Sequence, residues 1–414
     1  MQNLSTASIR LEPYDATTNI LLNSSSGNAG GGIFLDGNAP ATDISKLVGI
    51  KNLTIGRADG TGTTTVDASG FSFNANNNLS LLNGNIQVDG ALSNSNVSGH
   101  VLAQAGVGDV VIGSGGTVTA RGSGDAVVLV AQRNFVNQAG ANALAATNGR
   151  WLTYSSSPSD DVRGGLDVAF KQYAAQYGDT VLGSGNGHLY TYAPKVKVEL
   201  QGEVRKTYDG NAAASVSDAN FAMSGAIDGD TIDVLSFGNA YYADRNAGAG
   251  KQVTVDNVEV SEATNGTVKV YGYQVDASSV SGDVGQIDRK VLTANADVAN
   301  KTYDGSTTAN LSNVALVGVV AGDEGKVDTS GTTGAFSDKN AGQSKSVSGS
   351  GIALTGEEAD NYSFNTSAEI GKADIDRKVL TASADVADKT YDGTTTANLS
   401  NVSLVGICLL YTSP

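Results

Sequence analysis

The motif Lys-Thr-Tyr-Asp-Gly occurs three times, at residues 206–210, 301–305 and 389–393. An amine, a phenol and a carboxylate at fixed spacing could transfer protons or form a covalent intermediate. Such a set needs a pocket, whereas here the flanking strand sequence is copied with it. The repetition favours architecture, in which Asp-Gly forms a turn, Tyr anchors the core and Lys is a solvated strand end. The motif residues are Tyr208, Asp209, Gly210, Tyr303, Asp304, Gly305, Tyr391, Asp392 and Gly393.

Few other residues could support catalysis or bind a cofactor. A nucleophilic triad needs a histidine, and neither His100 nor His188 has neighbours that mark such a site. With Met1 and Met223 as the two methionines, axial haem ligation has few candidate ligands. Glycine-rich stretches lack the Gly-Lys-Ser/Thr ending of a phosphate loop. We therefore predict no catalytic residue and no cofactor.

Aspartates are the remaining candidates for chemistry. A polysaccharide-degrading enzyme would align carboxylates along one groove. Each candidate here stands beside glycine or in a turn-rich stretch, where aspartate is expected for conformational reasons. No EF-hand loop or GGxGxDxUx repeat is present, so we predict no metal site and leave only weak calcium binding at scattered turns open. The candidates are Asp36, Asp59, Asp67, Asp89, Asp109 and Asp125.

Composition indicates an all-β protein with an acidic surface. The 414 residues include 52 Gly and only 5 Pro, and acidic residues exceed basic ones by 42 − 26 = 16. This excess disfavours nucleic acid and anionic membranes as partners. No run of 18 apolar residues predicts a membrane span. The single cysteine, Cys408, excludes a disulfide framework within the chain.

Residues 1–150 show short apolar segments separated by Gly, Asn and Asp. They recur at intervals of roughly 20 residues, a spacing typical of solenoids whose coils bury apolar side chains against their neighbours. We predict a right-handed parallel β-helix acting as a stalk. A β-sandwich is the alternative, although it would show clearer two-residue hairpin signals.

Residues 151–195 interrupt this pattern. Leu166 and three aromatic residues fall at helical spacing within residues 164–178, which predicts a short amphipathic helix. The helix would cover the open end of the β-helix as a cap and linker. An exposed aromatic platform for sugar rings is the alternative. The predicted cap aromatics are Trp151, Phe170, Tyr173 and Tyr177.

The remainder is a tandem array. Motif tyrosines are separated by 95 and 88 residues, and residues 287–318 match residues 375–406 at 28 of 32 positions. Alternating strands and turn signals predict small β-sandwich-like domains. The predicted boundaries are 196–288 for the first repeat, 289–376 for the second and 377–406 for a partial third. Residues 407–414 break the copy abruptly, so we predict that this tail is a truncation or sequence artefact.

Several longer segments resemble a known family. The segments DAVVLVAQRNFVNQAGANAL, NGRWLTYSSSP, FKQYAAQYG and GSGNGHLYTYAP resemble the end of the β-helical region in filamentous-haemagglutinin-like adhesins of Gram-negative bacteria. The KTYDG units, with DRKVLTA before two of them and ADNYSF in one, resemble the YDG repeats that follow that region.

This resemblance implies a secreted or cell-surface protein exported by two-partner secretion, with an outer-membrane transporter as its export partner. The signal peptide and secretion domain of the family are not recognised in the sequence, which would make this chain an internal fragment. We expect a non-enzymatic adhesin that binds a glycan or protein on host or bacterial surfaces. The alternatives are a carbohydrate-active enzyme carried on the β-helix and a purely structural spacer.

Overall fold

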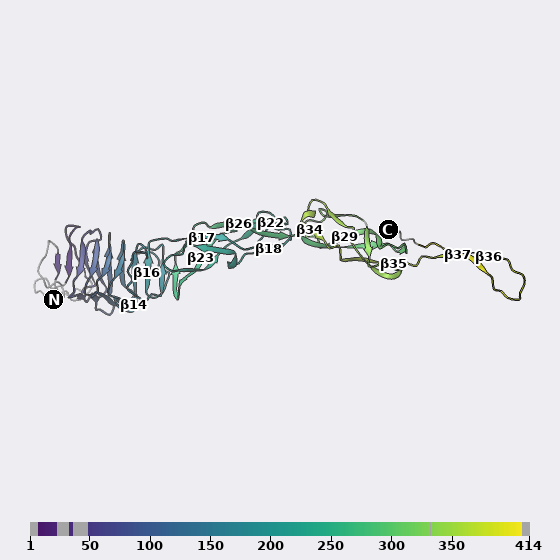
Figure 1. Cartoon of the computed structure of the whole chain (residues 1–414). Helices are drawn as coiled ribbons and strands as arrows, with labels where there is room; N and C mark the ends of the chain where they lie inside the picture. Colours follow the sequence, from purple (N-terminus) through teal and green to yellow (C-terminus); the bar gives the residue numbers. More distant parts are fainter. Residues whose placement is uncertain (1–6, 23–32, 36–48, 332, 408–414) are drawn as a thin grey trace. The chain divides into compact units, whose positions relative to one another are not determined.

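The computed structural model describes residues 7–22, 33–35, 49–331 and 333–407. Apart from two single-turn 3-10 helices, every regular element described is a β-strand (Figure 1). The predicted all-β class is therefore confirmed. No helix among these residues is long and apolar enough to cross a membrane. The chain divides into unit 1, residues 1–199, 221–238 and 256–280, and unit 2, residues 200–220, 239–255 and 281–414.

Unit 1 is built mainly from parallel strands, most of which pair with strands two or three positions away in chain order (Figure 1). The largest sheet has the order β1 (Ser8–Leu11), β4 (Asn52–Gly56), β7 (Asn78–Asn83), β10 (His100–Ala105), β12 (Thr117–Ala131), β14 (Leu144–Ser155), β16 (Gly187–Tyr190), β15 (Phe170–Gln172), β24 (Val268–Tyr271), β23 (Glu259–Asn265) and β20 (Thr231–Ser236), with β9 (Ala91–Asn94) between β12 and β6 (Phe71–Phe73). The second has the order β13 (Phe135–Asn137), β11 (Val110–Ile112), β8 (Asn85–Val88), β5 (Thr63–Val66), β2 (Ile20–Leu22) and β3 (Ile33–Leu35), and the third has the order β19 (Phe221–Ser224), β17 (Lys195–Leu200) and β25 (Gln274–Val275).

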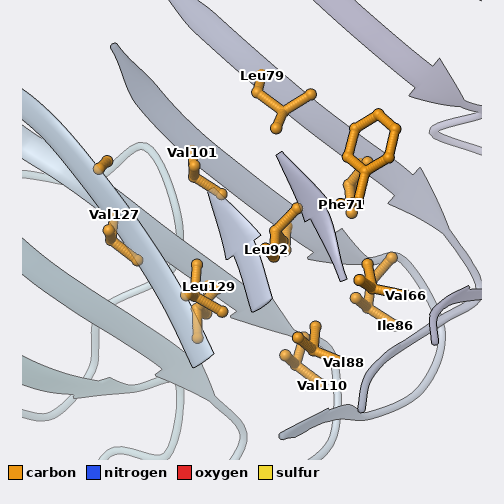
Figure 2. Close-up of a cluster of buried hydrophobic side chains, with 14 of the residues drawn as sticks. Val66, Phe71, Leu79, Ile86, Val88, Leu92, Val101, Val110, Val127 and Leu129 are labelled. Carbon is orange, nitrogen blue, oxygen red and sulfur yellow. The ribbon is translucent and has the colours of Figure 1, made fainter. Parts of the chain in front are cut away.

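The core of unit 1 forms because apolar residues recur at matching positions of successive strands. Leu79 of β7 lies opposite Val101 of β10, which lies opposite Val127 of β12. All three are fully buried, and Figure 2 shows them with the neighbouring apolar side chains of the same interior. Burying a side chain of this size contributes about 1.5–3 kcal/mol. Alternation of buried and more exposed residues along strands such as β7 and β10 thus defines the core.

Buried asparagines satisfy backbone groups where the chain turns between these strands. The Asn94 amide donates to the carbonyls of Asn77 at 3.0 Å and His100 at 3.1 Å. The Asn137 amide donates to the carbonyl of Gly140 at 2.9 Å. These side-chain hydrogen bonds replace the backbone hydrogen bonds between strands, which are interrupted where the chain turns. These two buried asparagines therefore have a structural role.

The predicted helix within residues 164–178 is wrong. Its central residues form β15, which pairs in parallel with β16 on one side and with β24 on the other. Glycines at 164, 165 and 178, together with Ala174, adopt positive φ angles that a right-handed helix excludes. The segment also does not end the sheet, as a cap would. Instead, it joins the stack to strands of the first repeat.

Unit 2 contains smaller, mostly antiparallel sheets. One sheet has the order β18 (Val204–Thr207), β26 (Ser279–Asp288), β22 (Gly248–Asp256) and β21 (Ala240–Tyr242); another has the order β28 (Lys301–Thr302), β35 (Glu369–Asp376), β32 (Gly342–Ser348), β31 (Thr333–Phe336), β29 (Thr308–Val317), β27 (Lys290–Val298) and β34 (Tyr362–Phe364). The remaining pairs are β30 (Asp328–Ser330) with β33 (Ala353–Thr355), and β36 (Thr381–Val386) with β37 (Leu399–Val405). The 3-10 turns are η2 (Asp218–Asn220) and η3 (Ala359–Asn361).

Candidate functional site

The Asp-Gly pair of the repeated motif forms a tight turn, as the sequence predicts. In the first copy Gly210 has a φ of +82°, which favours glycine. The Asp209 carboxylate accepts a hydrogen bond from the backbone N–H of Asn211 at 3.2 Å. The equivalent contacts are Ser306 to Asp304 at 2.8 Å and Thr394 to Asp392 at 3.0 Å, with φ values of +83° at Gly305 and +72° at Gly393.

The prediction that the motif lysine is a solvated strand end is wrong for Lys206 and Lys301, whose side chains are largely buried, whereas Lys389 is exposed. The Lys206 ammonium donates to the Asp209 carboxylate at 2.7 Å and to the carbonyl of Asn211 at 2.7 Å. Lys301 and Lys389 bind the equivalent aspartates at 2.8 and 2.9 Å. The lysine therefore closes the turn by binding the carboxylate three residues later.

The first motif tyrosine, Tyr208, belongs to a buried cluster inside unit 2. Its hydroxyl donates to Oδ2 of Asp323 at 2.8 Å, and the Tyr362 hydroxyl donates to the same oxygen at 2.7 Å. The Arg245 guanidinium lies 3.3 Å from Oδ1 of Asp323 and also binds Glu358. Since Tyr208 and Arg245 come from the first repeat and the other three from the second, the cluster joins consecutive repeats.

Unit 1 contains an equivalent cluster around Asp230 of the first repeat. Its Oδ2 accepts hydrogen bonds from the hydroxyls of Tyr173 at 2.7 Å and Tyr273 at 3.0 Å. The Lys171 ammonium binds Oδ1 of Asp230 and lies 2.8 Å from the Asp228 carboxylate. Tyr173 and Lys171 precede the first repeat in sequence, so this cluster also joins two modules.

The two clusters share their geometry as well as their residue types. The backbone N–H of Ile227, three residues before Asp230, donates to the Tyr273 hydroxyl at 2.9 Å. Likewise, the N–H of Val320, three residues before Asp323, donates to the Tyr362 hydroxyl at 3.0 Å. Each repeat thus presents a buried aspartate held by its own tyrosine, and the preceding module supplies the second tyrosine.

Burial and charge keep these groups in the protonation states that the hydrogen bonds need. Burial, reinforced by Asp230, raises the pKa of Tyr273 to about 12. Burial and the hydrogen bond to Asp323 also raise the pKa of Tyr362 to about 12. Burial favours the neutral form of Asp323, but hydrogen bonds from Tyr362 and Tyr208 outweigh it and lower the pKa of this carboxyl. The tyrosines remain donors and the aspartate an acceptor at neutral pH.

The later motif tyrosines have different surroundings. Tyr303 is half-buried against the core of the second repeat. Tyr391 is 93% exposed. The prediction of a core anchor therefore fits Tyr208 best, and there the tyrosine hydroxyl reaches an aspartate of the next repeat.

The predicted cap aromatics lie at the join between the stack and the first repeat. Trp151, Phe170 and Tyr173 are buried, whereas Tyr177 is 47% exposed. The Tyr173 ring packs against the ring of Tyr273 with centroids 5.0 Å apart. Because most of these faces are covered by protein, the set does not form an exposed sugar platform.

The other candidate side chains contact local partners. Among the aspartates, Asp67 accepts the N–H of Ser69 at 2.9 Å, and Asp125 binds Arg150 at 2.5 Å. Burial lowers the pKa of His188 to about 3, and its Nδ1 lies 2.5 Å from Oγ1 of Thr153. Asp59 binds Arg57, Asp89 binds Gln87, Asp109 binds Arg133, and His100 contacts the carbonyl of Ser123. Asp36, Met1 and Cys408 lie outside the described residues.

Within the described ranges, no group of three or more His, Cys, Asp or Glu side chains is arranged to hold a metal ion. Residues 192–279 and residues 288–369 each match the model of the YDG domain. The chain contains two YDG domains. This confirms the predicted YDG repeats, while the third copy lies outside both matches. No curated protein and no solved structure matches the chain.

The sequence alone did not mark the aspartates that accept hydrogen bonds from Tyr173 and Tyr208. Asp230 and Asp323 each follow a glycine, and they resemble ordinary turn residues. A signal was nevertheless present, because Lys171 and Tyr173 have the same Lys-x-Tyr spacing as Lys206 and Tyr208. Only the fold places that tyrosine beside a carboxylate more than 50 residues away.

Proposed function

We propose that this chain belongs to a secreted or surface-attached bacterial adhesin, with its parallel strands forming a right-handed β-helical stalk. The YDG domains extend that stalk as spacers. Binding to a glycan or protein ligand occurs through surface contacts, without catalysis. Export by a two-partner-secretion transporter is part of the same proposal, which takes these functional features from the resemblance of the sequence.

The pairing of strands in unit 1 supports the stalk. From β1 to β24 the largest sheet adds one parallel strand after another, and the second sheet is parallel throughout. Successive strands bury one shared apolar interior. An array of this kind grows by adding similar coils, and each coil stabilises its neighbours.

The repeated tyrosine–aspartate cluster is the observation that carries the spacer role. Asp230 and Asp323 each bind one tyrosine of their own domain and one of the preceding module. A buried carboxylate with two hydroxyl donors requires a defined geometry, since losing a donor leaves the charge poorly satisfied. The motif tyrosine Tyr208 supplies the second donor at the joint between the two YDG domains, and Tyr173, which lies outside the motif, supplies it at the joint before the first domain.

The test combines ligand binding with stability. The full chain is applied to a glycan array and to epithelial and bacterial cells, with and without calcium, and compared with Tyr208→Phe. We expect saturable binding by both proteins, and a melting temperature about 3 °C lower in Tyr208→Phe because a hydrogen bond to a buried carboxylate is lost.

Two outcomes would contradict separate parts of the proposal. Absence of saturable binding on every surface would argue against adhesion by this segment and leave the spacer role. If Tyr208→Phe instead abolished binding at an unchanged melting temperature, the tyrosine would belong to a ligand site. Tyr391→Phe is the matched control, since its ring is 93% exposed.

A further inference from the structure

The first YDG domain presents a surface that the second domain occupies within unit 2. Besides Tyr208 and Arg245, this surface includes the turn at Asn246 and Ala247. The backbone N–H of Ala247 donates to the side-chain carbonyl of Asn361 at 2.8 Å, and the Asn361 amide donates to Oδ1 of Asn246 at 3.3 Å. The Tyr208 hydroxyl, the Arg245 guanidinium and this turn therefore bind the acidic side of the next domain.

The second YDG domain carries a copy of the same surface. Asp244-Arg245-Asn246-Ala247 corresponds to Asp338-Lys339-Asn340-Ala341. The two turns contain the same hydrogen bond. The Asp244 carboxylate accepts a hydrogen bond from the N–H of Asn246, and the Asp338 carboxylate accepts one from the N–H of Asn340, each at 2.8 Å. The aspartates also bind Lys251 and Lys345, each at 2.6 Å.

The motif tyrosine of the second domain is placed in the same way. The N–H of Tyr303 donates to the carbonyl of Asp376 at 2.8 Å, as that of Tyr208 does to Asp288 at 2.8 Å. Tyr303 borders a hollow that is also lined by Asn340, Ala341, Arg377, Lys378 and Leu380. Within the part of the chain that the structure describes, neither the Tyr303 hydroxyl nor the Lys339 ammonium has a hydrogen-bonding or ionic partner.

The third copy begins at this hollow but does not provide the carboxylate. Arg377 and Gly406 correspond to Arg289 and Gly318 of the second repeat at a constant offset of 88 residues. By the same offset, Asp323 would correspond to position 411, which is a tyrosine. Position 411 therefore does not carry the carboxylate that both earlier joints contain.

We infer that the surface formed by Tyr303, Lys339, Asn340 and Ala341 is a docking site for the acidic turn of a complete third YDG domain. This inference rests on the proposed spacer function. The hollow contributes Arg377 and Lys378, and Lys339 adds a third positive charge in the turn next to Asn340. The acidic side of a YDG domain contributes counterparts of Asp323 and Glu358. Complementary charge and the observed occupancy of the equivalent surface both favour this occupant.

The test extends the full chain. Residues 407–414 are replaced by a second copy of residues 319–376, which completes the third repeat. Tyr303→Phe is then introduced into the extended and the original chain. We expect Tyr303→Phe to lower the melting temperature of the extended chain by about 3 °C, as Tyr208→Phe does in the original chain. In the original chain, Tyr303→Phe should change the melting temperature by less than about 1 °C.

A double-mutant cycle tests whether the tyrosine acts through the carboxylate. Asp323→Asn in the appended copy should remove most of the effect of Tyr303→Phe, while Tyr391→Phe should change neither chain. Three results would each overturn the inference. They are an equal fall in melting temperature in both chains on Tyr303→Phe, no fall in the extended chain, and an appended repeat that stays unfolded. Failure of Tyr208→Phe to destabilise the original chain would instead contradict the proposed spacer function.

Discussion

At the scale of single residues, the groups that surround each carboxylate determine its protonation state. Asp209, Asp304 and Asp392 have lowered pKa values, mainly through hydrogen bonds from motif lysines and turn N–H groups, although burial opposes these bonds most strongly at Asp209. Asp161 behaves in the opposite way. Burial raises the pKa of its carboxyl to about 6, despite hydrogen bonds from Ser155 and the N–H of Phe135.

We predict that Asp161→Asn stabilises the protein increasingly as pH rises. The folded-state pKa lies above the ordinary value of 3.8, so the protonated acid favours folding below pH 3.8 and this contribution is lost as pH rises through about 6. Asparagine keeps a neutral amide there. At pH 7.5 the variant should gain about 1–2 kcal/mol over the parent, with little gain at pH 4. Thermal melts across this pH range measure the difference.

Asp160→Asn is the control, because Asp160 is exposed. A gain for Asp161→Asn that does not depend on pH would show that ionisation of this carboxyl is not the cause.

At the scale of elements, β15 shows how a short strand replaces the expected helix. Phe170 to Gln172 pair with strands on both sides, and Ala174 then turns the chain with a φ of +51°. Pairing with two neighbours satisfies the backbone of this segment more fully than an isolated short helix would. Tertiary pairing therefore overrides the helical spacing of the aromatic residues.

We predict that Ala174→Gly leaves stability unchanged or raises it by up to about 1 kcal/mol. Glycine removes the steric cost of a positive φ, and the greater entropy of unfolded glycine offsets part of this gain. Ala174 is exposed, so few contacts are lost. The control Ala175→Gly alters a buried methyl group and should destabilise unit 1 by roughly 1 kcal/mol. Urea unfolding compares the two variants, and equal losses would contradict the prediction.

At the scale of the whole molecule, the boundaries of compact units and of YDG domains do not coincide. Unit 1 takes residues 192–199, 221–238 and 256–279 from the first YDG domain, whereas unit 2 takes residues 200–220 and 239–255. One tyrosine–aspartate cluster lies in each unit. The domain repeated in sequence is therefore shared between two packing units, and cooperative unfolding should follow the units.

We predict two thermal transitions, one for each unit. Lys171→Met should lower the melting temperature of unit 1 and leave that of unit 2 unchanged. Lys171 is 3% exposed in its side chain and pairs with the carboxylates of Asp230 and Asp228, the second of which also binds Arg163. Removing one member of a buried ionic set costs about 3–5 kcal/mol. Lys197→Met is the matched control, because its ion pair with Glu199 is exposed and should contribute less than about 1 kcal/mol. Calorimetry resolves the two transitions. An equal fall of both melting temperatures in Lys171→Met would contradict the prediction that the units unfold independently.

The repeated sequence was sufficient to predict the all-β class, the YDG repeats and the Asp-Gly turns. These features depend on local chemistry, namely alternation of apolar residues, the backbone freedom of Gly210 and the short reach from Asp209 to Asn211. Pattern alone also indicated that the motif is architectural, since it is copied together with its strand.

Three-dimensional packing decided the contacts that join the modules. Tyr208 and Asp323 are 115 residues apart, and Tyr173 and Asp230 are 57 apart. No spacing rule links such positions, because the strands between them must first pair and bring the hydroxyl to the carboxylate. Packing likewise converted the aromatic segment near Phe170 from an expected helix into a strand. Local residue types therefore set the turns, and long-range strand pairing determined which tyrosine meets which aspartate.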